Sequence, residues 1–200
     1  MSKKLLVATR NSGKVREFTR LLSDFNFDVI GLVDLGIEVE IEETGTTFEE
    51  NALIKARGYA DISGELTLAD DSGLVVDALD GEPGGMSARY GGKELNDGQR
   101  VELLLENMKE VPGWKRTARF IAVLALVGQD VSNGYSTSEG VLEGAITHEP
   151  IGHNGFGYDP VFWLSPHSKT VAELSGEGKD KLSHRGRAFE ELRRTLRLLE

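Results

Sequence analysis

The chain of 200 residues has 23 lysine and arginine residues against 33 aspartate and glutamate residues, and its net charge of −10 argues against a nonspecific nucleic-acid binder, which needs a basic face. It has no cysteine, which excludes disulfides, thiol nucleophiles and cysteine zinc sites. No apolar run approaches the roughly 20 residues of a membrane span, and the first apolar run is too short for a signal peptide. We therefore expect a cytoplasmic globular protein, with residues 1–200 forming one domain or two closely joined lobes.

The beginning of the chain predicts a strand, a polar loop and a helix. Residues 4–8 (KLLVA) are a short apolar run, after which apolar residues recur at helical spacing from Val15 to Phe25. Residues 28–33 (DVIGLV) predict a second strand. A charged connection follows this strand.

The rest of the chain continues this alternation. Thr46 followed by Glu49 matches a capping box, and one apolar face predicts a helix over residues 47–62. The order of the elements predicts a mixed α/β fold. The later predicted elements are a glycine-rich loop over residues 80–98, a helix with Val101, Leu104, Leu105 and Met108 inward, a central strand over 116–128, further strands over 134–146 and 155–164, and a helix within 183–200 with Ser183 as its cap and Phe189, Leu192, Leu196 and Leu199 on its apolar face.

Two adjacent carboxylates, Asp70 and Asp71, stand between apolar runs over residues 66–69 and 73–79, which we interpret as two flanking strands. Like charges that are partly dehydrated repel each other, so a fold keeps them only where a cation or a proton-transfer task offsets the cost. We predict that Asp71 lies at a strand end, where α/β folds usually mount their chemistry.

The loop Thr9–Lys14 (TRNSGK) connects the first predicted strand to the first predicted helix. Such a turn presents free backbone N–H groups and the positive end of the helix dipole, and Lys14 adds a charge suited to phosphate. It is not a Walker A loop, because the first glycine is missing and Val15 replaces the residue that would contact magnesium. The alternative is a plain loop with a helix-capping asparagine.

Carboxylates from two separate loops could hold a metal. Magnesium binds a few hard carboxylate oxygens and keeps its other positions for water and substrate phosphate, which suits ligands drawn from the pair Glu42 and Glu43 and the pair Asp70 and Asp71. A carboxylate beside such a metal can also take a proton from an attacking water. The alternative is that the glutamates form a solvated acidic loop and that Asp70 only caps a turn.

Two later segments suit a nucleotide. Residues 155–160 (GFGYDP) place glycines beside aromatic rings, which can stack on a nucleobase; the alternative is aromatic core residues at a bend. Residues 179–187 (KDKLSHRGR) gather cations where the last predicted helix begins, which opposes the helix dipole unless an anion binds there. Arg185 offers planar paired donors, although a solvated basic patch is the alternative.

Six segments in chain order carry a resemblance: TRNSGK, EETGTTFEENALIKA, ADDSGL, PGGMSARYGG, FGYDPVF and LSHRGRA. Together they resemble the successive signature blocks of the inosine triphosphate pyrophosphatase family, and the match runs from residue 5 to residue 190. Gly85 and Met86 stand where that family usually has a bulkier residue, so the role of residues 83–92 stays open.

The resemblance implies Mg²⁺-dependent hydrolysis of non-canonical purine nucleoside triphosphates such as ITP, dITP and XTP to the monophosphate and pyrophosphate. It also implies a homodimer and an elongated mixed sheet flanked by helices, with two lobes around a central substrate cleft. The expected partner is a small-molecule nucleotide, with no nucleic acid and no membrane. A pyrophosphatase for other nucleotides and a non-catalytic nucleotide-binding sensor remain as alternatives.

The resemblance also assigns residues. Asp71 matches the general base and metal partner, Ser72 the adjacent substrate contact, and Glu42 and Glu43 are both eligible as the metal-binding glutamate. The expected triphosphate loop is Thr9, Arg10, Asn11, Ser12, Gly13 and Lys14, with Asn11 and Lys14 in direct contact and Lys14 neutralising charge during catalysis. The expected contacts of the base, and those that close over base and phosphate, are Phe156, Gly157, Tyr158, Asp159, Lys179, His184 and Arg185.

Overall fold

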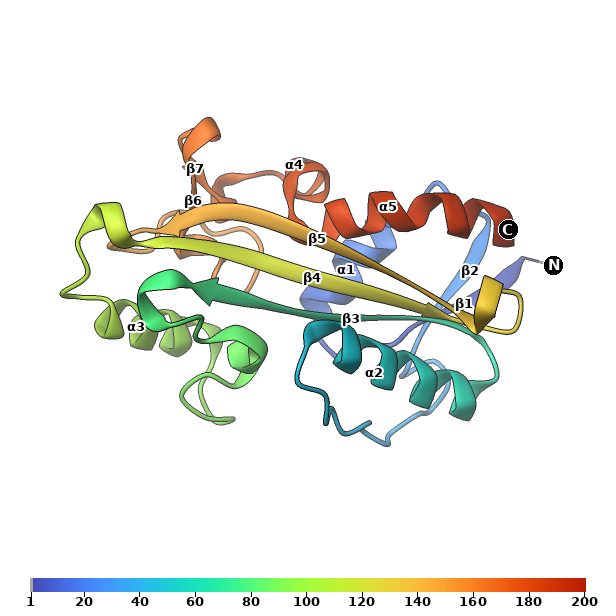
Figure 1. Ribbon diagram of the computed structural model, residues 1–200. Helices are drawn as coiled ribbons and strands as arrows, with labels where there is room; N and C mark the ends of the chain where they lie inside the picture. The colour runs from blue at the N-terminus through green and yellow to red at the C-terminus, as the bar shows by residue number, and fades with distance from the viewer. Residues whose placement is uncertain (1) are drawn as a thin grey trace. The chain divides into compact units, whose positions relative to one another are not determined.

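The computed structural model describes residues 2–200 as helices packed on a seven-stranded sheet of order β2-β1-β3-β4-β5-β6-β7 (Figure 1). Strand β1 is parallel to β2 and β3, whereas β6 is antiparallel to β5 and β7, so the predicted mixed α/β sheet flanked by helices is confirmed. The strands are β1 (Lys3–Val7), β2 (Phe27–Gly31), β3 (Leu66–Val76), β4 (Thr117–Val127), β5 (Tyr135–Ile146), β6 (Phe162–Leu164) and β7 (Lys169–Thr170). The helices are α1 (Ser12–Leu21), α2 (Phe48–Ser63), α3 (Asp97–Asn107), α4 (Gly176–Leu182) and α5 (His184–Leu199).

The chain divides into two compact units. The first contains the residues up to Asp71, residues 122–140 and residues 184–200; the second contains residues 72–121 and 141–183. Strands β3, β4 and β5 each contribute residues to both units. Within residues 2–200, no helix is both long enough and apolar enough to cross a membrane.

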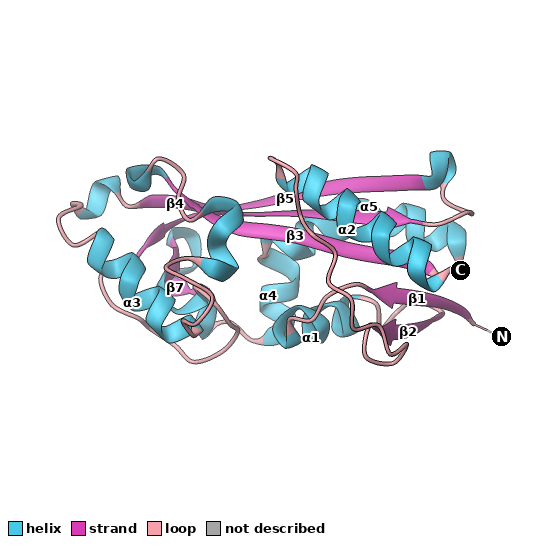
Figure 2. Ribbon diagram, turned by 90° about the horizontal axis from the view of Figure 1, so that it is seen from below, coloured by secondary structure: helices cyan, strands magenta, loops and turns pink. Residues whose placement is uncertain are grey.

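The first unit has a core on each face of its strands. Alternate residues of a strand point to opposite faces, so Leu5 of β1 packs in one cluster and Leu6 in the other. The cluster of Leu5 contains Phe18 of α1 and Phe189 of α5. The cluster of Leu6 contains Ala56 of α2. Seen from below in Figure 2, α2 lies in front of the strands.

The second unit has one apolar core and a buried arginine. Leu104 of α3 and Met108, which caps the end of that helix, pack with Phe120 of β4 and Phe162 of β6. The ring centroids of Phe120 and Phe162 lie 4.3 Å apart. The guanidinium of Arg116, only 2% exposed, donates to backbone carbonyl oxygens. Its Nε lies 2.8 Å from the oxygen of Ile146, its Nη1 2.7 Å from that of Met108, and its Nη2 2.8 Å from that of Thr147. Arg116 therefore joins the end of α3 to the end of β5.

Replacing Arg116 with methionine is expected to lower the free energy of unfolding by roughly 3 kcal/mol, because buried carbonyl oxygens lose their donors. Urea denaturation measures the loss. Arg119→Met on β4, three residues later, is the matched control, since Arg119 makes a half-exposed ion pair with Asp77 that contributes about 1 kcal/mol or less. Equal losses in the two variants would contradict this role for Arg116.

Most predicted helices and strands are confirmed, but several boundaries were wrong. Strand β3 runs without a break through Asp70 and Asp71, so Asp71 does not lie at a strand end. The capping box of α2 is Thr47 with Glu50, one residue later than predicted, because both Thr46 and Thr47 donate their N–H to Glu50.

Two further predictions from apolar patterns were wrong, one on the buried face of α1 and one on the strand over residues 155–164. Val15 is 36% exposed, although it has the spacing of the buried face of α1. The segment predicted as a strand over 155–164 forms a 3-10 turn, Asp159–Val161, and the short strand β6. Pro160 has no N–H to donate to a ladder, which accounts for the turn.

Candidate active site

Strand β3 carries Asp70 and Asp71 on opposite faces, because successive side chains of a strand alternate. Asp70 contacts Lys14 of α1 and Arg185 of α5, whereas Asp71 lies near Lys55 of α2. In Figure 1, α5 lies above the strands and α2 below them. The two carboxylates therefore face different helices, and each has its own paired cations.

Asp70 belongs to a buried network of four charges. Arg185 places Nε 2.9 Å from Asp70 Oδ2 and Nη1 2.5 Å from Glu17 Oε2. Lys14 Nζ pairs with the other oxygen of Asp70, Oδ1. Glu17, Asp70 and Arg185 are 4%, 1% and 3% exposed, so a lost partner would leave a charge away from water.

This network fixes the protonation of its members. Burial alone would raise the pKa of Asp70, but the cations of Arg185 and Lys14 outweigh burial and hold that pKa well below its usual range. Burial alone would lower the pKa of Arg185, but Asp70 and Glu17 outweigh it and raise that pKa. Burial lowers the pKa of Lys14, against the opposing effect of Asp70. Asp70 is thus a permanent anion and not a proton acceptor.

The loop before α1 bonds mainly to itself. Asn11 is the N-cap of α1, and its Oδ1 accepts from the N–H groups of Gly13 at 2.9 Å and Lys14 at 3.1 Å. Thr9 Oγ1 accepts from the N–H of Asn11 at 3.2 Å. The expectation that these N–H groups are free was wrong, and the alternative of a helix-capping asparagine is confirmed. Ser12, the first residue of α1, is exposed.

Arg10 is bound to the segment that leads to the glutamates. Its Nη2 donates to the carbonyl oxygen of Ile37 at 2.7 Å and lies 3.4 Å from that of Val39. The Tyr59 hydroxyl donates to the same Val39 oxygen at 3.3 Å. Arg10 therefore holds the chain on its way to Glu43, a role that the sequence pattern did not indicate.

Asp71 and Glu43 lie on either side of one lysine. Lys55 Nζ is 3.2 Å from Glu43 Oε2 and 3.7 Å from Asp71 Oδ1, and it donates to the carbonyl oxygen of Asp70 at 3.0 Å. Asp71 is 8% exposed. Burial raises its pKa to about 6, with Glu43 adding to that effect and Lys55 opposing it. A carboxyl group with this pKa changes its protonation close to neutral pH, as a general base requires.

The donors around Lys55 fit a hard divalent cation. Two carboxylates that converge on one ammonium group already form a cation site, and Mg²⁺ usually binds through one or two carboxylates plus substrate phosphate and water. Glu42 is exposed, which favours Glu43 of the two eligible glutamates. Among residues 2–200, no group of three or more histidine, aspartate or glutamate side chains is arranged for a metal. A metal bound here would thus take its remaining oxygen ligands from substrate phosphate and water.

In the second unit, the segment Phe156–Asp159 is a tight turn stabilised by hydrogen bonds to the buried carboxylate of Asp159. Asp159 Oδ2 accepts from the Phe156 N–H at 2.9 Å and from Lys179 Nζ at 2.5 Å, and both charged side chains are buried. Lys179 Nζ also lies 4.5 Å from the centre of the Phe156 ring. The Gly157 N–H donates to Asp97 Oδ2 at 2.9 Å.

These contacts divide the predicted base-binding residues into two kinds. Tyr158 is 5% exposed in the core of its unit, so the alternative of an aromatic core residue is confirmed for it. Asp159 and Lys179 pair with each other and shape the turn. Phe156 and Gly157 are half-buried and reach the surface of the turn. Ser72 is half-buried in β3.

The cations of residues 179–187 do not gather at one helix start. Lys179 and Lys181 lie in the last turn of α4, where the helix dipole favours a cation. His184 and Arg185 begin α5 and are buried. The dipole argument therefore holds only for the second group, because the separate helix α4, which ends before Ser183, was not predicted from the sequence.

Sequence reasoning missed Lys55 and Glu17, although each left a signal. Lys55 stands inside an apolar stretch of the predicted inner face of its helix, and Glu17 lies three residues after Lys14, on the same helix face. A charged residue on an apolar face indicates a buried partner. That partner could not be named from the sequence.

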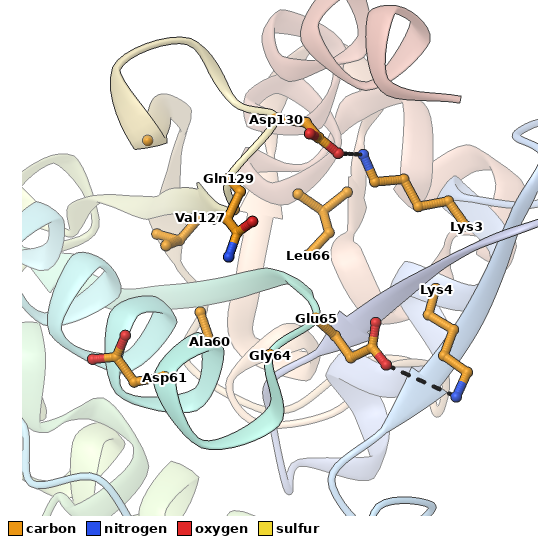
Figure 3. Close-up of a pocket in the computed structure, with 12 residues that line it drawn as sticks. Lys3, Lys4, Ala60, Asp61, Gly64, Glu65, Leu66, Val127, Gln129 and Asp130 are labelled. Carbon is orange, nitrogen blue, oxygen red and sulfur yellow. Dashed lines mark hydrogen bonds and ion pairs between the residues drawn. The ribbon is translucent and has the colours of Figure 1, made fainter.

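A separate surface pocket of about 430 Å³ lies in the first unit where β1 and β3 begin (Figure 3). Lys3 pairs there with Asp130 at 2.5 Å and Lys4 with Glu65 at 3.8 Å. None of the predicted site residues lines this pocket. Both of its lysines are paired with carboxylates, so we do not assign it to the active site.

Comparisons with known proteins find relatives that match almost the whole chain. A sequence model of the Ham1 family matches residues 5–195. A Bacillus licheniformis relative named dITP/XTP pyrophosphatase is 49% identical over 192 residues, which are 95% of this chain and 96% of the relative. The solved Ham1 protein of Staphylococcus aureus has a TM-score of 0.85 at 38% identity, with 99% of this chain and 100% of that chain covered. A HAM1 protein of Coxiella burnetii has a TM-score of 0.85 at 41% identity, with 98% of each chain covered.

Proposed function

Because this chain belongs to the Ham1 family, we propose that it hydrolyses the non-canonical purine nucleoside triphosphates dITP, ITP and XTP to the monophosphate and pyrophosphate. The family expectation drawn from the six sequence blocks is confirmed by the match over residues 5–195. The observation that carries the chemistry is Asp71, a buried carboxyl group with a pKa raised to about 6 beside Glu43 and a lysine.

In the proposed reaction, Asp71 orients a water molecule and takes its proton as the water oxygen attacks the α phosphorus. The bond between that phosphorus and the oxygen bridging to the β phosphate breaks, and its electron pair leaves with pyrophosphate. Lys14 stabilises the negative charge that develops on the phosphates. A bound polyphosphate in turn favours the charged ammonium form of Lys14, which burial disfavours. Arg185 holds Asp70, which in turn holds Lys14.

We propose Mg²⁺ as the cofactor, held by Asp71 and Glu43. The two positive charges of Mg²⁺ would offset the negative charge of the phosphate oxygens and favour the ionised form of Asp71. Lys55 keeps the two carboxylates together when no divalent cation is bound. Glu42 is not part of this proposal, since its side chain is exposed.

We propose that Phe156 stacks on the base and that His184 helps to recognise its 6-oxo group. A 6-oxo purine accepts a hydrogen bond where adenine carries a donor amino group, so a site built from donors leaves adenine unpaired. Arg185 uses Nε and Nη1 within the buried network and is therefore proposed to position Lys14 rather than to bind the base.

Replacing Phe156 with alanine is expected to raise KM for ITP several-fold, because base stacking contributes about 1–3 kcal/mol per base. Steady-state kinetics over a range of ITP concentrations measures the change. Phe156→Tyr keeps an aromatic ring and is the matched control, with KM near that of the unmodified protein. An unaltered KM in Phe156→Ala would remove the stacking role.

The proposed function is tested by incubating the protein with Mg²⁺ and ITP, dITP, XTP, ATP and GTP and separating the products by chromatography. We expect monophosphate and pyrophosphate from the first three nucleotides, with ATP and GTP spared. Diphosphate plus orthophosphate would contradict the proposed bond cleavage. Thermal stabilisation by ITP without any product would favour a nucleotide-binding sensor.

We also propose that residues 1–200 form a single domain with two lobes, since three strands continue from one unit into the other. We propose a homodimer, with a mass in solution of twice 21.9 kDa by light scattering. The nucleoside triphosphate pool that the reaction would cleanse lies in the cytoplasm, which is the proposed location. A single-chain mass would contradict the dimer.

A further inference from the structure

The turn Gly84–Arg89, whose role the sequence left open, packs against strand β3 within the second unit. A Cβ atom on Gly73 would lie 2.2 Å from the carbonyl oxygen of Gly84 and 2.8 Å from Ser87 Oγ. Such separations do not occur for real side chains, so only glycine at position 73 lets the turn approach this closely. The turn is therefore fitted to β3 one residue after Ser72.

Ser87 makes the contacts that hold the turn in this position. Its Oγ accepts from the Leu74 N–H of β3 at 2.8 Å and donates to the carbonyl oxygen of Gly84 at 2.6 Å. The side chain of Ser87 is 8% exposed, so water does not compete readily for these bonds. One hydroxyl group thus joins the turn both to the strand and to its own first residue.

The same serine also contacts the proposed base-binding turn. The Tyr158 hydroxyl donates to the carbonyl oxygen of Ser87 at 2.9 Å, and the Tyr158 ring lies in the apolar core. Burial raises the pKa of Tyr158, so its hydroxyl keeps the proton that it donates. The chain of contacts therefore runs from β3 through Ser87 to Tyr158, which adjoins Phe156 and Gly157.

We propose that Ser87 is a positioning residue, which fixes the Phe156–Asp159 turn relative to Ser72 through the Tyr158 hydroxyl and thereby sets the affinity for the purine base. This inference rests on the proposed function, because the turn is assigned there to the base. Neither Ser87 nor the Tyr158 hydroxyl is placed against the substrate. Their effect passes through the position of Phe156 and Gly157.

The test compares Tyr158→Phe, Ser87→Ala and the double variant. Tyr158→Phe removes one hydroxyl and leaves the ring in the core. We expect about a fivefold to tenfold rise in KM for dITP, a similar fall in the preference for dITP over dATP, and kcat within about twofold. Because the two groups act through one contact chain, the double variant should show less than the product of the single effects.

Tyr90→Phe is the matched control, since the Tyr90 hydroxyl in the same loop accepts from Asn107 Nδ2 of α3 at 2.7 Å, a hydrogen bond outside the Ser87–Tyr158 chain of contacts. It should leave KM and preference unchanged. The proposal is overturned if Tyr158→Phe keeps the KM and preference of the unmodified protein, if Tyr90→Phe changes them equally, or if the double variant shows the full product of the single effects. If the unmodified protein forms no pyrophosphate from dITP, the proposed function itself is overturned, and this result is distinct from the three above.

Discussion

Asp71→Asn is expected to keep its fold and to lose roughly 10²-fold or more in turnover of dITP, the usual scale for a lost general base. Asparagine has nearly the shape of aspartate but cannot accept a proton from water. Initial rates of pyrophosphate release measure the loss, and circular dichroism checks the fold. Asp130→Asn is the matched control, because Asp130 is an exposed carboxylate paired with Lys3, and its variant should keep full turnover.

The pH dependence gives an independent test of the same residue. The pKa of Asp71 is raised to about 6 from an ordinary value of 3.8, so the ionised form that accepts a proton is lost below about pH 6. Turnover without saturating metal should therefore fall about tenfold per pH unit below 6 and level off above it. A flat profile between pH 5 and pH 7 would refute Asp71 as the base.

The stability of the fold should change with pH in the direction opposite to turnover: it should fall as pH rises. The folded state binds the Asp71 proton more tightly than the unfolded chain does, so its contribution to stability is complete below about pH 4 and is lost as pH rises through about 6. At pH 7.5, Asp71→Asn should therefore unfold at a higher urea concentration than the unmodified protein. Its stability should also lack the decline between pH 4 and pH 6 that this group causes.

Arg185→Met is expected to lower the free energy of unfolding by about 3–5 kcal/mol, because it leaves the carboxylates of Glu17 and Asp70 buried without their shared cation. Urea denaturation at pH 7.5 measures the loss. Arg194→Met on the same helix is the matched control, since Arg194 is exposed and its replacement should change stability by no more than about 0.5 kcal/mol.

A second measurement separates charge from packing in Arg185→Met. Without the guanidinium, Asp70 and Glu17 should take up protons more readily, so the stability difference between variant and unmodified protein should shrink as pH falls toward 4. A difference that is the same at pH 7.5 and pH 4 would mean that the lost packing of Arg185, and not its charge, is responsible.

The features that the sequence predicted well depend on neighbours along the chain. The apolar run that became β4 and the spaced apolar residues Val101 and Leu104 of α3 define their elements locally. The capping box was misplaced by one residue because Thr46 and Thr47 are both suitable and both contact Glu50. Local patterns could not separate two such candidates.

The features that the sequence could not predict depend on partners far along the chain. The continuity of β3 through Asp70 requires Arg185, which lies 115 residues later, and Lys14. Their pairing with Asp70 cannot be read from either segment alone. The position of Asp71 beside Lys55 likewise follows from the packing of α2 on β3. The contacts that surround the two aspartates were thus harder to predict than the helices and strands that carry them.

The alternation along β3 makes the surroundings of Asp70 and Asp71 depend on strand register. Leu66 pairs with Leu5 and Leu68 with Val7, and this alignment decides which acidic side chain meets which helix. A slip by one residue would turn every side chain of the strand over. The aspartate that pairs with Arg185 and the aspartate beside Lys55 would then exchange surroundings, so the hydrogen-bond ladder between β1 and β3 decides which of the two has a lowered pKa and which has a raised one.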